Sequence, residues 1–110
     1  MRLALAQINP VVGDLEGNRE LILERLAEAK ANAAELVIFP ELAVTGYPPE
    51  DLLLRPGFIR AAEESVERIA REARGTTVLV GGPHFDRDLY NACYVCAGGE
   101  IKAVYQLYHA

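Results

Sequence analysis

The chain has 110 residues, of which 51% are hydrophobic and 25% charged, and its formal net charge is −5. This length and composition predict one soluble globular domain with a buried core. The acidic balance, with no cluster of Lys and Arg, excludes electrostatic binding of nucleic acid or anionic membranes, and no apolar run approaches the roughly 20 residues of a membrane span.

The first predicted strand covers residues 3–8, and nearly all of them are apolar. This pattern is typical of a strand that is covered on both faces inside a layered α/β sheet. The apolar block is too short for a secretory signal, so we expect a cytoplasmic protein. A helix follows, with Asp14 or Asn18 as its N-cap. Its inner face is predicted from apolar residues at helical spacing, namely Leu15, Ile22, Leu26, Ala29 and Ala33.

The second predicted strand covers residues 36–39 and ends at Pro40, which cannot donate a ladder hydrogen bond. Glu41 follows at the carboxyl end of this strand, where open α/β sheets bind their ligands. The apolar neighbours of Glu41 predict partial burial of its carboxylate, which would suit a general base. The residues alone leave open the alternative of a solvated loop glutamate, because glutamates are rarely buried.

The second half of the chain continues the alternation of helix and strand. Pro49 suits the first turn of a short helix over residues 50–54, and a longer helix begins after Gly57 and stops at Gly75. Its predicted inner face consists of Phe58, Ala62, Val66, Ile69, Ala70 and Ala73. Three strands follow, over residues 76–80, 89–96 and 101–107, with Gly81-Gly82-Pro83 closing the first and Gly98-Gly99 forming a hairpin turn between the last two.

This order of elements predicts an α/β fold with a mixed β-sheet. We expect residues 3–8, 36–39 and 78–80 to be neighbouring inner strands, because all three are apolar. Right-handed crossovers between them would put both long helices on the same face of the sheet.

Cys93 and Cys96 form the only C-x-x-C pattern, within a predicted strand. Residues three apart on a strand point to opposite faces and lie about 10 Å apart, which is too far for a disulfide. A redox motif would instead sit at a helix N-terminus, so we interpret both as small buried hydrophobic residues. Zinc is not expected, since His84 and His109 are isolated from further ligands.

Five short blocks carry a recognisable pattern along nearly the whole chain. They are Leu5-Ala6-Gln7-Ile8-Asn9-Pro10; Gly13-Asp14 with Asn18; Phe39-Pro40-Glu41-Leu42 with Thr45-Gly46-Tyr47; Val80-Gly81-Gly82-Pro83; and Tyr90-Asn91-Ala92 before Gly98-Gly99-Glu100-Ile101. In this order they resemble the N-terminal part of the carbon–nitrogen hydrolase (nitrilase) superfamily. The longer run over residues 46–54, with Pro56 and Phe58, is similar to the glutaminase domain of glutamine-dependent NAD synthetases.

The resemblance implies the N-terminal portion of a nitrilase-type αββα sandwich, so that residues 1–110 make a partial glutaminase domain. It implies a Glu, a Lys and a Cys that together hydrolyse an amide: Glu41 matches the general base, and Tyr47 matches an aromatic residue of the glutamine pocket. Packing of Tyr47 over Pro48-Pro49 is an equal alternative. The implied partner is glutamine or another small amide. No metal or cofactor is expected within this chain, because ATP and Mg would belong to a separate synthetase domain.

The sequence departs from the family pattern near its end. Leu107 stands at the position of the family's Lys, Lys102 is expected to be a solvated surface residue, and the nucleophilic Cys belongs beyond residue 110. We expect neither Cys93 nor Cys96 to replace that nucleophile, since either would have to move to the far side of the site to do so. The resemblance therefore implies the N-terminal part of a glutamine amidohydrolase domain that supplies ammonia for NAD synthesis, catalytically incomplete as it stands.

Two alternatives remain open from the sequence. The chain is either part of a longer enzyme, shortened by a premature stop, a frameshift or design, or a non-catalytic nitrilase-like interaction domain. A fragment of another amidase or nitrilase is a further possibility. Half a sandwich would leave one sheet face bare, so self-association is expected.

Overall fold

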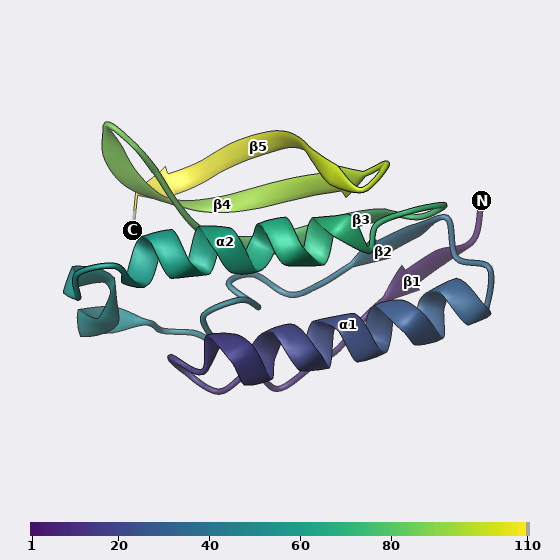
Figure 1. Ribbon diagram of the computed structural model, residues 1–110, viewed down its shortest axis with the longest axis horizontal. Helices are drawn as coiled ribbons and strands as arrows, with labels where there is room; N and C mark the ends of the chain where they lie inside the picture. The colour runs from purple at the N-terminus through teal and green to yellow at the C-terminus, as the bar shows by residue number, and fades with distance from the viewer. Residues whose placement is uncertain (110) are drawn as a thin grey trace.

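The protein is described by a computed structural model of residues 1–109 and contains one mixed five-stranded sheet (Figure 1). The strands lie in the order β1 (Leu3–Leu5), β2 (Leu36–Ile38), β3 (Thr77–Asp86), β4 (Asp88–Ala97) and β5 (Glu100–His109). The first three are parallel to one another, whereas β4 and β5 form an antiparallel meander on β3. The predicted hairpin at Gly98-Gly99 is confirmed.

Two long helices, α1 (Leu15–Ala31) and α2 (Phe58–Arg71), lie side by side on one face of this sheet (Figure 1). A short 3-10 helix, η1 (Glu50–Leu54), precedes α2. The core lies between the helices and the sheet, and its most deeply buried apolar side chains come from both layers: Ile22, Leu26, Val37, Val66, Ile69, Val78 and Val80. The predicted α/β fold with both helices on one face is confirmed. No helix within residues 1–109 is long and apolar enough to cross a membrane.

Three local predictions were wrong. β1 has three residues and lies at the sheet edge, so Leu3 and Leu5 are 51% and 71% exposed instead of covered on both faces. β3 does not close at Gly81-Gly82-Pro83 but continues to Asp86, because these residues pair with β4. Ala33 is exposed, because α1 ends at Ala31 and the chain turns there with a φ of 58°.

Asp14 is the N-cap of α1, and its Oδ1 accepts a hydrogen bond of 2.9 Å from the Gly17 amide. Asn18 has a different task. Its side chain is fully buried, its Nδ2 donates to the carbonyls of Val11 (2.8 Å) and Val44 (3.1 Å), and its Oδ1 accepts from the Val11 amide at 2.7 Å. Asn18 therefore ties the loop after β1 to the loop that carries Glu41.

We expect Asn18→Leu to lower the free energy of unfolding by roughly 1–3 kcal/mol, which is the cost of leaving a buried polar group without its hydrogen-bond partner. Urea denaturation of the purified chain measures this loss. The matched control is Asn32→Leu, where an exposed amide donates only to the Glu28 carbonyl at 2.9 Å. Equal losses in the two variants would contradict the tying role of Asn18.

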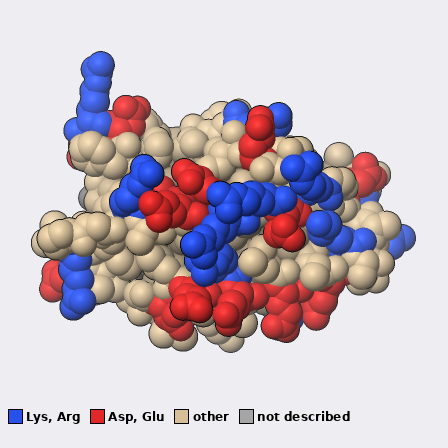
Figure 2. All heavy atoms as spheres, in the orientation of Figure 1, with Lys and Arg blue, Asp and Glu red and all other residues tan. Residues whose placement is uncertain are grey.

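The sheet face turned away from the helices is largely apolar and uncovered. Strand alternation puts Leu5, Ile38, Leu79, Val95 and Tyr105 on it, and Leu5 and Tyr105 are 71% and 61% exposed. Charged side chains of both signs instead gather over the two helices (Figure 2). An apolar face of this kind favours association.

We expect the purified 110-residue chain to self-associate through this face, with a mass in light scattering that rises with concentration. Leu5→Lys should weaken association by putting a charge on the face. The control Leu54→Lys changes an 82% exposed leucine on η1 and should leave association unchanged. A monodisperse monomer at high concentration would contradict this expectation.

Candidate functional site

Glu41 lies just beyond the carboxyl end of β2, where the backbone crosses over β3. Gly81 makes this crossing possible. A Cβ atom at Gly81 would come within 2.5 Å of the Leu42 nitrogen and 3.1 Å of the Glu41 Cα. Leu42 itself adopts a φ of 53°, and the Val44 amide donates to the Gly81 carbonyl at 3.2 Å. The position of Glu41 is therefore set by backbone packing against a glycine of the sheet.

The Glu41 side chain is exposed, so the expected partial burial is wrong. Its apolar neighbours Phe39 and Leu42 turn into the protein, where they are 5% and 6% exposed, and this leaves Glu41 facing outward. Glu41 is nevertheless held. Its Oε1 accepts hydrogen bonds from Asn91 Nδ2 at 2.9 Å and from the Tyr108 hydroxyl, and Asn91 Nδ2 also donates to the Tyr108 hydroxyl oxygen at 2.6 Å.

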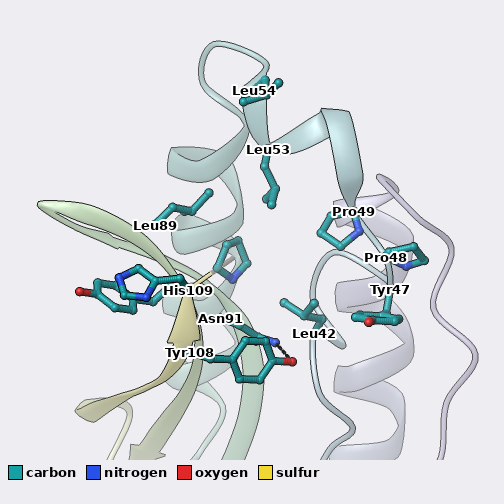
Figure 3. A pocket seen from close by; sticks show the side chains of 12 residues that line it. Leu42, Tyr47, Pro48, Pro49, Leu53, Leu54, Leu89, Asn91, Tyr108 and His109 are labelled. Carbon is teal, nitrogen blue, oxygen red and sulfur yellow. Dashed lines mark hydrogen bonds between the residues drawn. The ribbon is translucent and has the colours of Figure 1, made fainter.

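The partners of Glu41 form one wall of an apolar cavity of about 440 Å³ (Figure 3). Asn91 and Tyr108 come from neighbouring strands, and Tyr47 with Pro48 and Pro49 comes from the loop on the other side of Leu42. Tyr47 is 67% exposed and lines this cavity beside both prolines. The structure therefore brings the two residues singled out in the sequence, Glu41 and Tyr47, to one end of the sheet.

A second cavity, of about 160 Å³, lies directly beside Glu41. Cys93 and Leu107 line it together with Glu41. Both cysteines are free. Burial raises the pKa of the Cys93 thiol. The pKa of the Cys96 thiol is raised to about 11, mainly by burial and to a smaller extent by the nearby Cys93. Both therefore stay protonated at neutral pH, unlike an activated nucleophile.

Sequence reasoning did not single out Asn91 or Tyr108 as partners of Glu41. Asn91 had two signals, since it is a polar residue inside a largely apolar strand and belongs to the block Tyr90-Asn91-Ala92, and it is 2% exposed. Tyr108 had none, because its hydroxyl reaches Glu41 across 67 residues of sequence. His84 and His109 each face one carboxylate, Glu63 at 3.2 Å and Asp88 at 3.1 Å, and within residues 1–109 no group of three or more His, Cys, Asp or Glu could hold a metal.

The fold and site define an α/β protein with a carboxylate held at the end of an inner parallel strand. The carbon-nitrogen hydrolase family model matches residues 2–109, and the chain belongs to this family. It is 44% identical over 108 residues to the glutamine-dependent NAD(+) synthetase of Thermotoga maritima, covering 96% of this chain and 19% of that protein. The corresponding synthetase of Aquifex aeolicus is 43% identical with the same coverage.

Solved structures agree with this assignment. A glutamine-dependent NAD(+) synthetase from Cytophaga hutchinsonii superposes with a TM-score of 0.89 at 32% identity, over 94% of this chain and 18% of that one. An amidase from Nesterenkonia superposes with a TM-score of 0.83 at 27% identity, over 100% of this chain and 44% of that one. The chain spans about a fifth of the length of the curated synthetases that it matches.

Proposed function

We propose that this chain is the N-terminal part of a glutamine amidohydrolase domain that supplies ammonia for glutamine-dependent NAD synthesis. Glu41 is the general base, and Tyr47 is part of the wall of the amide pocket. The observation that carries the proposal is the Glu41 carboxylate at the end of β2, held by Asn91 and beside an open cavity, in a chain 44% identical to such a synthetase.

In the implied chemistry a Cys thiol attacks the amide carbon and Glu41 accepts the thiol proton, which then passes to the leaving ammonia. Glu41 next accepts a proton from the water that hydrolyses the thioester. A Lys at the position of Leu107 would stabilise the carbonyl oxygen, which a leucine cannot do. The nucleophile, and an ATP- and Mg-using synthetase domain, would belong to segments outside residues 1–110.

Another amidase or nitrilase is the second candidate. The 440 Å³ cavity favours it, since most residues of its lining are apolar. The polar ones are Asn91, His109 and three tyrosines, and no Asp, Glu, Lys or Arg of the described residues is among them. The free α-amino and α-carboxylate groups of glutamine would need charged partners.

A non-catalytic interaction domain is the third candidate, favoured by the uncovered sheet face. Sequencing the gene beyond codon 110 separates an enzyme from a stand-alone domain.

We expect no ammonia release from glutamine by the purified 110-residue chain, because it has only one of the three catalytic groups.

The decisive test is a hybrid in which residues 1–110 replace the matching segment of the T. maritima synthetase. This hybrid should be nearly inactive, and Leu107→Lys should restore ammonia release by at least about 10²-fold, as oxyanion donors usually contribute. Hydrolysis of apolar amides but not glutamine would instead favour the amidase. No gain with Leu107→Lys would contradict the proposed position of the lysine.

A further inference from the structure

Glu41 is held through one of its two carboxylate oxygens. Asn91 Nδ2 and the Tyr108 hydroxyl both donate to Oε1, and they are the hydrogen-bond partners of this carboxylate within residues 1–109. A carboxylate can accept a proton at either oxygen. With Oε1 occupied by two donors, Oε2 is the oxygen left to accept one.

Asn91 is well suited to this task because it cannot turn away. It is 2% exposed on β4, between Pro83 of β3 and Tyr108 of β5. Its Oδ1 is buried and has no hydrogen-bond partner among the described residues. An unpaired buried oxygen costs about 1–3 kcal/mol. The amide keeps this orientation because a flipped Asn91 would turn its oxygen toward the Glu41 carboxylate and lose both hydrogen bonds of Nδ2.

A β-bulge brings Tyr108 to the same place. Ala92 pairs with Gln106, so an unbroken ladder would put Leu107 opposite Asn91, but the register shifts and Tyr108 pairs with Asn91 instead. Leu107 is the extra residue, and it lines the small cavity beside Glu41. Bulges commonly redirect side chains in this way near functional sites.

We propose that Asn91 and Tyr108 are positioning residues that fix Glu41 Oε1 and leave Oε2 as the oxygen that accepts the proton. The inference rests on the general-base role proposed for Glu41. During the reaction the proton of the attacking thiol or water moves to Oε2, which gives a neutral carboxyl group. The Tyr108 proton stays on its phenol, because the hydrogen bond to Glu41 raises the pKa of that phenol.

The test is an ultraviolet titration of tyrosine in the purified 110-residue chain. Each protein is titrated with and without the additional substitution Tyr108→Phe. The difference between the two titration curves is the titration of Tyr108 alone. Glu41→Gln should lower the pKa of Tyr108, because the hydrogen bond to the Glu41 carboxylate is the main reason why that pKa is raised. Asn91→Leu should raise it further, because the hydrogen bond from Asn91 favours the phenolate. The control Gln106→Leu removes an amide that bonds Asp86 at 3.0 Å and should leave the pKa unchanged.

A Tyr108 pKa that moves with neither substitution would overturn the inference. Because Asn91→Leu alters a buried residue, Tyr108→Phe gives a second test at a 49% exposed position. We expect it to shift the NMR resonances of the Asn91 side-chain amide, which loses one of its two acceptors, and unshifted resonances would also overturn the inference. These readouts do not involve catalysis. Failure of Glu41→Gln to reduce turnover in the hybrid hydrolase would instead remove the proposed function.

Discussion

Glu41→Gln is expected to lower glutamine hydrolysis by roughly 10²–10⁴-fold in the hybrid hydrolase that carries residues 1–110 with Leu107→Lys. Glutamine keeps the size of the side chain and can still accept hydrogen bonds at its carbonyl oxygen, but it cannot take up a proton at neutral pH. The loss should therefore fall on kcat. The exposed position of Glu41 makes a folding defect an unsatisfactory explanation for such a loss.

Ammonia release and single-turnover thioester formation measure this effect. Glu20→Gln is the matched control, since Glu20 is an exposed glutamate on α1, away from Glu41 and its partners. Near-normal turnover of the Glu41→Gln variant would show that Glu41 is a loop residue and not the general base.

Gly81→Ala is expected to damage both the fold and the position of Glu41. The added Cβ would lie 2.5 Å from the Leu42 nitrogen, a backbone atom that cannot rotate away. Overpacking of this kind costs about 1–3 kcal/mol. The clash is relieved only if the backbone at Glu41 and Leu42 moves. A displacement of a catalytic group by about 1 Å can lower the reaction rate roughly 10²-fold. We expect both stability and hybrid activity to fall.

The neighbouring glycine provides the control for this change. A Cβ at Gly82 would meet Val44 Cβ at 3.5 Å and Tyr94 Cε2 at 3.6 Å, which are ordinary van der Waals contacts. Urea denaturation should therefore show a much smaller loss for Gly82→Ala than for Gly81→Ala. Equal losses of stability in the two variants would contradict this argument. They would show that any alanine in this part of β3 is destabilising, whether or not the Glu41 backbone crosses over it.

The order of elements and the site-bearing loop could be predicted from the sequence because both are local. The apolar runs around Val37 and Val78 predict strands, and Pro40 marks the end of β2 beside Glu41. The start of α1 was predicted at Asp14 or Asn18, and the structure has Asp14 as the cap. Each of these signals depends on a few consecutive residues and on backbone preferences that act within them. The family resemblance also depended on such short blocks.

The environment of Glu41 was decided by the tertiary structure. Asn91 is 50 residues away from Glu41 in sequence and Tyr108 is 67 residues away, and no local period relates them. The bulge that turns Tyr108 toward Glu41 exists only when β4 and β5 pair. The exposure of Glu41 likewise depends on Phe39 and Leu42 finding space in the core. Local sequence determined where the carboxylate stands, whereas packing between distant strands determined what holds it.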